Sequence, residues 1–301
     1  MARGCESMLP GHRRLIYDPW AKHFLPFKYS GFRFLDTLSR VSPFGSVAEW
    51  QAEVARRAII RYMDRVYPGG YGFVIARTRY FDDYLEDCLR KGIDQVVILG
   101  AGFDARAYRV DALKEGQVKV FEVDQAGTMN RKMKLVRKTL GTLPDHVIYV
   151  VINFETDDLG QRLRSSGYDS RGKTLFVWEA VSGYLSPDAV DDVLKFITGG
   201  SGEGSHIIFD YPDISFIREP GQSEEAAVLH RFHARIGEPP TFGVDHKQIE
   251  AFLSQRGFCD IKSVSAESMG PVYFGAEKTR IRVSPFFHFV HATIRTQAPQ
   301  Y

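Results

Sequence analysis

The segment QVVILGAGFDARAYR, residues 95–109, most constrains what this chain can fold into. Gln95–Leu99 has the composition of a buried parallel strand, and the turn Gly100-Ala101-Gly102 follows directly. Glycine permits a tight turn and a close approach of a ligand to the main chain. The helix expected from Phe103 to Val110 would offer free N–H groups to an anion or polar group. The segment therefore predicts a strand–turn–helix unit that binds a nucleotide-type cofactor.

An acid at the end of the next strand strengthens this interpretation. Lys119–Val123 is a short apolar run, and Asp124 follows it, 22 residues after Gly102. An acid in this place can accept hydrogen bonds from both ribose hydroxyls of a cofactor. The glycine pattern ending at Ala105 also fits a dinucleotide fingerprint, so nicotinamide and S-adenosyl cofactors both remain open.

Composition restricts the class of protein. The 301 residues are 44% hydrophobic and 25% charged with a net charge of +2, which predicts a globular protein without a nucleic-acid partner. The three cysteines, Cys5, Cys88 and Cys259, lack disulfide or zinc spacing. No apolar run reaches the ~18 residues of a membrane span, and no signal-peptide core is visible. We therefore expect a cytoplasmic enzyme without membrane association.

Strands and helices alternate regularly after residue 94, which predicts a parallel sheet covered on both faces. The expected strands are 95–99, 118–123, 146–152, 174–178 and 206–209, and the expected helices between them are 104–113, 126–140, 157–166 and 187–198. Five Lys or Arg residues are assigned to the outer face of the helix 126–140. Asp245 is expected to cap a further helix that ends at Gly257. The tail reads as β-structure over 258–264, 272–274 and 285–294, with the late strands antiparallel.

Two segments outside this alternation are expected to act as lids on one domain, 1–301. The first is the helical region 1–92, with helices over 47–66 and from Ile75 to Arg90; Arg77 and Arg79 would lie in the first turn of the second helix, where cations are disfavoured unless an anionic partner is present. The second is the insertion 213–242 after the fifth strand, while 93–212 and 243–301 form the cofactor-binding core. Aromatic side chains crowd the start of the first lid and must pack or line a pocket: Tyr17, Trp20, Phe24, Phe27, Tyr29, Phe32 and Phe34.

Taken together, the strand ends resemble one family. VVILGAGFDARAYR, FEVDQAGT and FVWEAVSGYLSP are similar to motifs of the leucine carboxyl methyltransferase family, in particular its bacterial S-adenosylmethionine-dependent O-methyltransferases of polyketide-type metabolism. LIYDPWAKHF, IARTRYFDDYL and GEPPTFGVDHKQIEAFLSQRGF also resemble that branch. The resemblance implies a Rossmann-like class I methyltransferase fold of the α/β type: a doubly wound, mostly parallel seven-stranded sheet with a C-terminal antiparallel hairpin.

The resemblance also implies roles for individual residues. Arg77 would hold the methionine carboxylate of the cofactor, Gly100, Ala101 and Gly102 would pass close to it, and Asp124 with Gln125 would bind the ribose. The family usually has Asp-Leu where this chain has Asn153-Phe154, whose amide could still contact the adenine amino group. Glu179 would lie near the amino group of the cofactor. Tyr184 would face the methyl acceptor and is the candidate catalytic residue.

We therefore predict an S-adenosylmethionine-dependent O-methyltransferase for a small-molecule carboxylate or phenolic hydroxyl, rather than for a protein C-terminal carboxylate. A carboxylate acceptor needs no base, whereas a phenol would profit from one. His12 and His23 in the first lid and His230 and His233 in the second are candidates, none of them assigned, and no third ligand suggests a metal. The alternatives are an NAD(P)-dependent oxidoreductase that uses the same glycine turn, and a non-catalytic cofactor-binding relative.

Overall fold

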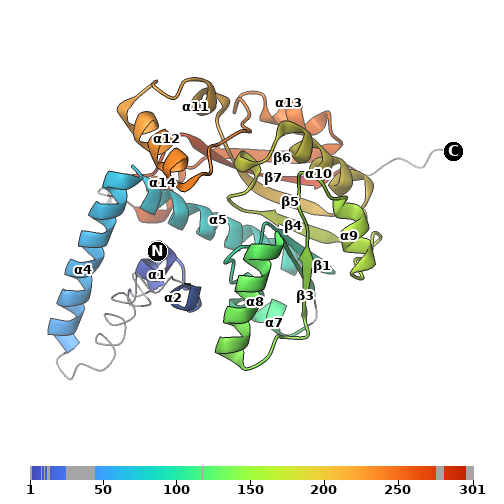
Figure 1. Cartoon of the computed structure of the whole chain (residues 1–301), viewed down its shortest axis with the longest axis horizontal. Helices are drawn as coiled ribbons and strands as arrows, with labels where there is room; N and C mark the ends of the chain where they lie inside the picture. The colour runs from blue at the N-terminus through green and yellow to red at the C-terminus, as the bar shows by residue number, and fades with distance from the viewer. Residues whose placement is uncertain are drawn as a thin grey trace.

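A computed structural model describes residues 2–7, 9, 11, 14–24, 45–116, 118–275 and 281–295. Its centre is a seven-stranded sheet of order β3-β2-β1-β4-β5-β7-β6 (Figure 1). The first five strands of this order are parallel, and β7 is antiparallel to both of its neighbours. This confirms the predicted doubly wound, mostly parallel sheet with an antiparallel C-terminal pair. The strands are β1 (Gln95–Leu99), β2 (Lys119–Asp124), β3 (Val147–Val151), β4 (Thr174–Trp178), β5 (His206–Pro212), β6 (Phe258–Ser265) and β7 (Phe287–Ile294).

The central strands are apolar because helices cover both faces of the sheet. β1 and β4 are buried along their whole length, and Val97 of β1 lies in register between Phe121 and Phe176 of its two neighbours. Successive residues of a strand point to opposite faces, so Ile98 and Val97 enter two separate hydrophobic clusters. Such runs of Val, Ile and Phe are typical of parallel strands in α/β folds.

Helices from different parts of the chain form the two covering layers (Figure 1). One layer contains α5 (Gly70–Arg90) and α8 (Ala126–Leu140), together with α6 (Arg106–Arg109) and α7 (Asp111–Lys114). The other contains α9 (Leu159–Ser165), α10 (Pro187–Gly199) and α13 (Ile249–Ser254). Ser186 caps α10 with its side chain and Pro187 occupies the first turn, as the sequence predicts.

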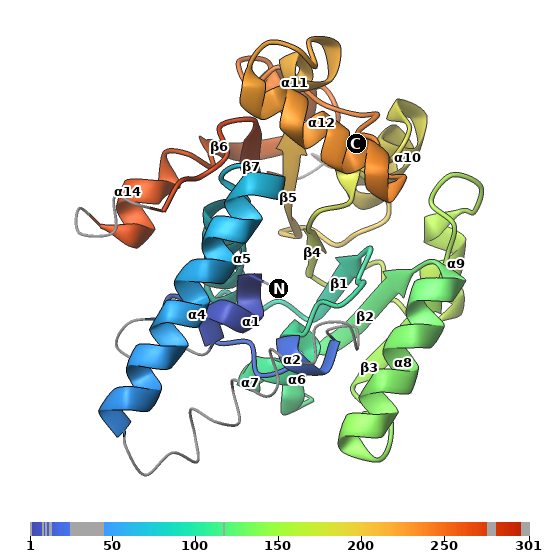
Figure 2. The same cartoon turned by 60° about the vertical axis from the view of Figure 1, so that its left-hand side comes forward.

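The predicted lid segments are the region 1–92 and the insertion 213–242, but α5 of the first segment belongs to the layer that covers the sheet. The first contains α1 (Ala2–Ser7), α2 (Ala21–Phe24) and α4 (Gly45–Val66), and the insertion after β5 contains α11 (Ile214–Arg218) and α12 (Glu224–Ile236). Figure 2 shows α12 beside the end of α4, and the two helices are in contact. Their junction includes Tyr67 and Phe232, whose rings meet edge to face at 5.2 Å.

The start of α5 corrects the sequence prediction. The helix begins at Gly70 rather than Ile75, so Arg77 and Arg79 lie in its interior and not in its first turn. The glycines before Ile75 suggest a break between the two helices, but Gly72 lies within α5 and lets the main chain of Arg282 pack closely against it. A Cβ on Gly72 would lie 2.2 Å from the carbonyl oxygen of Arg282. The residues around 282 are remote in sequence, so this packing could not be read from the local pattern.

Other local predictions were also wrong. The helix expected over 104–113 consists of the two short helices α6 and α7, which meet at the extended residue Val110. The tract 272–274 belongs to a helix, α14 (Met269–Phe274), rather than to a strand. The helix expected after Asp245 begins at Ile249, and Asp245 instead accepts a hydrogen bond from the main chain of Lys247.

Of the aromatic side chains expected to pack, Trp20 and Phe24 are buried and Tyr17 is 42% exposed, whereas Phe27, Tyr29, Phe32 and Phe34 lie outside the described residues. The three cysteines form no disulfide. Within the part of the chain that the structure describes, no helix is long and apolar enough to cross a membrane.

Candidate active site

The glycine turn and the acid of β2 come together as predicted. Asp124 accepts hydrogen bonds from the N–H of Gly102 at 2.5 Å and from the N–H of Gln125 at 2.6 Å. Burial raises the pKa of Asp124, and these two N–H groups act against that rise. Ala101 is buried within the turn. The structure therefore gathers Gly100, Ala101, Gly102, Asp124 and Gln125 at the ends of β1 and β2.

Gly100 is required at the turn for two reasons. Its φ of +63° lies in the left-handed region, which a side chain disfavours. A Cβ there would also lie 2.2 Å from a methyl carbon of Val181. The turn thus packs against the segment that follows β4, and both belong to one site.

A buried ion pair that the sequence analysis missed is hydrogen-bonded to the main chain of the glycine turn. Lys132 is 1% exposed, not on the outer face of α8 as expected, and its ammonium group lies 2.8 Å from Glu122 of β2. The same ammonium group donates to the carbonyl of Ala101 at 3.3 Å, and the Tyr108 hydroxyl donates to Glu122 at 2.8 Å. An acid in the middle of the apolar strand 119–124 was the available signal, because such a group needs a buried partner.

Asn153 and Phe154 follow β3 and differ in their surroundings. The side-chain oxygen of Asn153 accepts the main-chain N–H of Glu155 at 3.1 Å, so this oxygen already serves the local turn. Its amide NH₂ group remains the part suited to a ligand. Phe154 is buried and packs in the hydrophobic cluster between the sheet and α10.

Arg77 lies between two carboxylates at the ends of β4 and β5. Its Nε donates to Glu179 at 3.0 Å and its Nη1 donates to Asp210 at 2.8 Å. Burial opposes the charge of Arg77, but Asp210 and Glu179 hold its pKa above the usual value. The structure therefore brings Arg77 and Glu179 together, and shows that both polar contacts of this arginine go to acids of the protein.

Glu179 also contacts a second buried arginine that the sequence analysis did not single out. Arg106 is fully buried, and its guanidinium group pairs with Glu179 at 2.6 Å, with Asp82 at 2.8 Å and with Asp104. Burial favours the protonated form of Glu179, but Arg106 and Arg77 hold the pKa of Glu179 below its usual value. The signal available was the charged pattern Asp104, Arg106 and Arg109 directly after the glycine turn.

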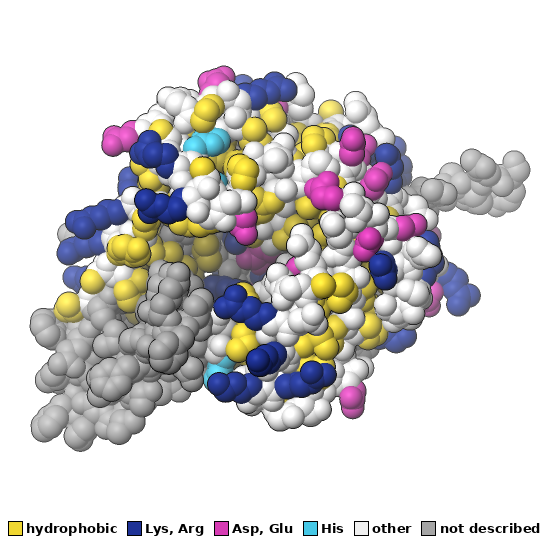
Figure 3. Space-filling model, in the orientation of Figure 1, with side chains coloured by type: hydrophobic (Ala, Val, Ile, Leu, Met, Phe, Trp, Pro, Cys, Tyr) yellow, Lys and Arg dark blue, Asp and Glu magenta, His cyan; other side chains and the backbone are white. Residues whose placement is uncertain are grey.

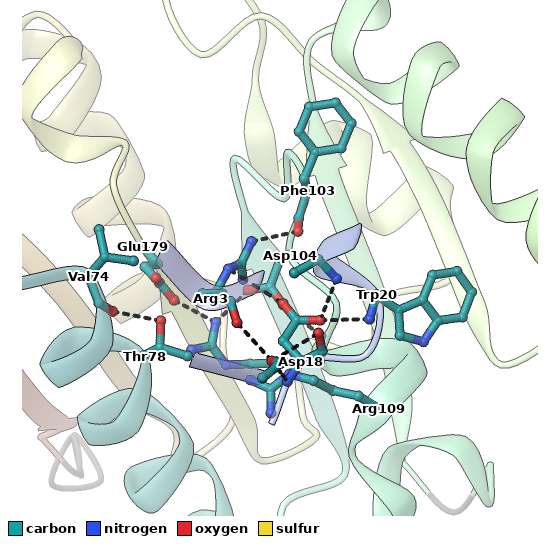
Figure 4. Close-up of polar contacts among 12 residues, drawn as sticks. Arg3, Asp18, Trp20, Val74, Thr78, Phe103, Asp104, Arg109 and Glu179 are labelled. Atoms are coloured by element: carbon teal, nitrogen blue, oxygen red, sulfur yellow. Dashed lines mark hydrogen bonds and ion pairs between the residues drawn. The ribbon is translucent and has the colours of Figure 1, made fainter. Parts of the chain in front are cut away.

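The N-terminal segment packs against the cluster of Arg106, Asp104 and Glu179, and hydrogen bonds hold it there (Figure 4). Arg3 donates to the carbonyl of Phe103 at 2.9 Å and lies 3.5 Å from Asp18. Asp18 in turn accepts the N–H groups of Trp20 and Ala21 and so fixes the start of α2. Phe24 packs on Phe103 at a ring distance of 5.3 Å. The first lid therefore covers the glycine turn.

Ala180, directly after Glu179, has an unusual backbone. Its φ is +61°, and its N–H donates to the free oxygen of the Asp210 carboxylate at 2.6 Å. A non-glycine residue in this region is strained and is found where surrounding contacts impose it, often at functional sites. Here the left-handed conformation of Ala180 changes the direction of the chain after β4, and Val181 and Tyr184 follow.

A cavity of about 470 Å³ opens beside these residues and between the two lids. Its base includes Arg77, Asp210 and Ala180, and Tyr184 forms part of its wall, with 37% of its surface exposed. Burial raises the pKa of Tyr184 to about 12, so its hydroxyl stays protonated at neutral pH. Figure 3 shows hydrophobic side chains around a central hollow with acidic groups inside it. Besides Tyr184, the wall includes the rings of Tyr62, Tyr67, Phe73, Phe216, Phe232, Phe287 and His233.

The candidate histidines are placed differently. His12 lies outside the described residues, and His23 packs beside Trp20 at a ring distance of 6.0 Å. His230 contacts the carbonyl of Phe216 at 2.5 Å, whereas His233 lines the cavity. Away from the glycine turn, Asp213, His246 and His288 form a group of three possible metal ligands among the described residues, and a hydrogen bond of 2.9 Å already joins Asp213 and His246.

The donor set fits S-adenosylmethionine. Asp124 presents a carboxylate at the end of β2, where a ribose diol would donate to it, and the glycine turn leaves the main chain open to close approach. The methionine part of that cofactor carries an ammonium group and a carboxylate. The site offers groups of both opposite signs, because Arg77 and Arg106 lie beside Glu179. Nη2 of Arg106 is buried without a hydrogen-bond partner among the described residues, so one donor of this cluster is not used by these residues.

The sheet order, the glycine turn and the acid at the end of β2 define a Rossmann-like methyltransferase of class I. The family model for leucine carboxyl methyltransferase matches residues 1–198, and the chain belongs to this family.

Individual relatives agree with this assignment. YktD of Bacillus subtilis (strain 168), provisionally assigned as an S-adenosyl-L-methionine-dependent methyltransferase, is 28% identical over 218 residues, 72% of this chain and 71% of that protein. A Mycolicibacterium paratuberculosis (strain ATCC BAA-968 / K-10) protein with the same kind of assignment is 37% identical over 201 residues, 64% of this chain and 63% of its own length. The match thus spans slightly less than two thirds of the mycobacterial relative.

A solved structure shows the same fold. The crystal structure of a DUF574 family protein from Streptomyces avermitilis MA-4680 has a TM-score of 0.59 and 14% identity, and the match covers 87% of this chain and 96% of that one. The chain is an S-adenosylmethionine-dependent methyltransferase on the basis of its family and relatives.

Proposed function

We propose that this enzyme methylates an oxygen atom of a small molecule, either a carboxylate or a phenolic hydroxyl. The cavity between the lids carries this proposal, because its 470 Å³ fall in the range of small-molecule sites. Its aromatic wall favours a flat, apolar acceptor over a protein C-terminus. A cytoplasmic location also stays a prediction, which fractionation of the source cells would test.

We assign the cofactor contacts as part of the same proposal. Asp124, supported by the N–H groups of Gly102 and Gln125, would accept the ribose hydroxyls, and Asn153 with Phe154 would border the adenine. Arg77 and Glu179 would hold the carboxylate and amino groups of the methionine part. Tyr184 would contact the acceptor as a hydrogen-bond donor, since its hydroxyl is protonated at neutral pH.

The protein contributes position and exclusion of water rather than covalent chemistry. S-adenosylmethionine supplies, when bound, a methyl group that its sulfonium already activates. The strained turn at Ala180 and the contact of Gly100 with Val181 fix the wall between the glycine turn and the cavity. The two lids close the cavity on its other sides, so an acceptor would be oriented and dehydrated together.

Calorimetric titration with S-adenosylhomocysteine, with NADH as the parallel ligand, is the first test. We expect S-adenosylhomocysteine to bind and NADH not to bind. In a second assay with S-adenosylmethionine carrying a labelled methyl group, we expect transfer to members of a panel of aromatic carboxylates and phenols. Binding of NADH alone would favour the oxidoreductase alternative. Binding of S-adenosylhomocysteine without transfer to any member of the panel would favour a non-catalytic relative.

A further inference from the structure

His233 stands out among the polar groups of the acceptor cavity because its ring nitrogens form no hydrogen bond of normal geometry with the residues that the structure describes. Its side chain lines the cavity and is only 3% exposed. Buried polar groups in proteins are almost always paired, so an imidazole without a hydrogen-bond partner in the wall of a cavity indicates a ligand that completes it.

The neighbours of His233 hold its ring in place without using its nitrogens. Its ring meets Tyr67 and Phe232 edge to face, at centroid distances of 5.8 and 5.7 Å, and lies 5.8 Å from the ring of Tyr184. One turn earlier on α12, His230 differs because its Nε2 already contacts the carbonyl of Phe216. The same helix therefore carries one histidine used by the fold and one left for a ligand.

The surroundings keep His233 neutral. Burial lowers the pKa of His233 below 6.5, His230 acts in the same direction, and the main chain of Glu238 opposes it. Among the described residues, the phenols of Tyr67 and Tyr184 also lie against its ring, and burial raises the pKa of both, so they stay protonated. A neutral imidazole has one nitrogen that accepts a proton and one that donates.

The other polar groups of the cavity are less suited than His233 to accept a proton from an acceptor. Asp210 accepts hydrogen bonds from Ala180 and from Arg77, and its negative charge is already paired with the charge of Arg77, whereas His233 has no such pairing within the part of the chain that the structure describes. Arg77 contacts Glu179 and Asp210 and is assigned to the methionine carboxylate of the cofactor, so the carboxylate of an acceptor would meet no further cation among the described residues at the base of the cavity. Arg235 also lines the cavity, but it is exposed and therefore a screened partner.

From these contacts we propose that His233 binds the hydroxyl group of a flat aromatic acceptor and takes its proton during methyl transfer. The inference rests on the proposed function and narrows it to phenolic acceptors. The acceptor oxygen forms its bond to the methyl carbon as the carbon–sulfur bond of the donor breaks. The phenolic proton moves to the imidazole nitrogen, and the positive charge lost from sulfur resides on the imidazolium until solvent removes the proton.

Two variants of His233 separate a catalytic role from a packing role. His233→Phe keeps an aromatic ring against Tyr67 and Tyr184 but has no nitrogen, and His233→Gln keeps a hydrogen-bonding group that is no base at neutral pH. His230→Gln, one turn away, is the matched control because it lies outside the cavity lining. Binding is compared with the wild type while every protein is loaded with S-adenosylhomocysteine, and methyl transfer is measured with S-adenosylmethionine as the donor.

The probes are 7-hydroxycoumarin, a flat phenol, and coumarin-3-carboxylic acid, a flat carboxylate, titrated by fluorescence. We expect 7-hydroxycoumarin to bind the wild type and His230→Gln more tightly than the carboxylate does. His233→Phe should weaken this binding at least about tenfold, the loss of one buried hydrogen bond. His233→Gln should bind the phenol but form 7-methoxycoumarin about 10²–10⁴-fold more slowly. The fall in wild-type transfer at acidic pH should disappear in His233→Gln.

The proposal is overturned if His233→Phe binds the phenol as the wild type does, or if the wild type binds only the carboxylate or neither probe. It is also overturned if His233→Gln transfers methyl groups at the wild-type rate. Affinity for S-adenosylhomocysteine is measured in every variant. If the wild type does not bind S-adenosylhomocysteine, the proposed function is refuted instead. Variants that bind it as tightly as the wild type are folded.

Discussion

At the residue scale, Asp124 shows how a site can be prepared for a ligand before the ligand arrives. Its two oxygens already accept the N–H groups of Gly102 and Gln125, which fixes the carboxylate at the end of β2. Each of these oxygens retains a second lone pair for a ribose hydroxyl. A carboxylate held in this way loses little freedom on binding, so its contribution to affinity is close to that of its hydrogen bonds.

We predict that Asp124→Ala weakens S-adenosylhomocysteine binding by at least about 1.5–3 kcal/mol, the value of a hydrogen bond to a charged group. Arg77→Ala should also weaken it, because this variant removes the proposed partner of the methionine carboxylate and leaves Asp210 without the cation that pairs with it. Calorimetric titration measures both, with the exposed Glu115→Gln as control. Unchanged affinity in both site variants would contradict the proposed cofactor contacts.

Lys132 and Glu122 form a second residue-scale case, and here stability is the readout. Lys132→Met should destabilise the fold by about 3–5 kcal/mol, because it leaves the fully buried Glu122 without its cation. The double variant Lys132→Met/Glu122→Gln should recover much of this loss, since no charge is then left buried. Denaturant unfolding measures both variants. Equal stability of the single and double variants would show that the ion pair is not the reason for the effect.

At the scale of elements, the glycine turn joins β1 to the segment after β4. Gly100→Ala combines two costs, the positive φ of 63° and the clash of the new Cβ with Val181. Gly92→Ala shares the first cost only, because its φ is +76° and its Cβ would meet no atom within 4 Å. The pair therefore separates backbone strain from packing.

We expect Gly92→Ala to cost about 1 kcal/mol of stability and to leave S-adenosylhomocysteine binding unchanged. Gly100→Ala should cost more and should weaken binding, because Val181 and the turn cannot both keep their places. Thermal unfolding and calorimetry on the same samples provide the two readouts. Equal effects of the two substitutions on both measurements would show that Val181 yields without consequence.

The elements also show what sequence could and could not predict. The alternation of strands and helices gave the sheet, because burial on both faces and the caps at Ser186 and Gly141 act locally. The acids at the strand ends, Asp124 and Glu179, were found for the same reason. Arg106 and His233 were not assigned, because what makes them notable is a partner, or the lack of one, on elements remote in sequence.

At the scale of the whole molecule, β7 links the core to the second lid, since it pairs with β5 directly before the insertion. It carries two histidines, His288, which is buried, and His291, which is partly buried. Burial lowers the pKa of His288 to about 4, with His246 adding to this and Asp213 opposing it. Burial also lowers the pKa of His291 to about 4, with Lys262, His206 and Lys91 adding to it and Asp87 opposing it.

These two pKa values imply a sign for the pH dependence of stability. Between about pH 6.5 and 4 the unfolded chain holds protons on both histidines that the folded chain does not, so each histidine lowers the free energy of unfolding as the pH falls. After allowance for partial exposure, the loss is about 1–2 kcal/mol per histidine. Buried acids with raised pKa values, such as Asp210, act in the opposite direction, so only a comparison of variants isolates the effect.

We therefore predict that His291→Phe, which can keep the ring contact with Tyr84 at 4.1 Å, flattens the fall in stability between pH 6.5 and 4. His288→Phe can likewise stack on Tyr211 and should flatten it further in the double variant. Denaturant unfolding at several pH values measures the slope for each protein. Parallel curves for wild type and double variant would mean that the acid sensitivity of this fold arises elsewhere, whereas a flatter curve for the double variant would place it at the histidines of β7.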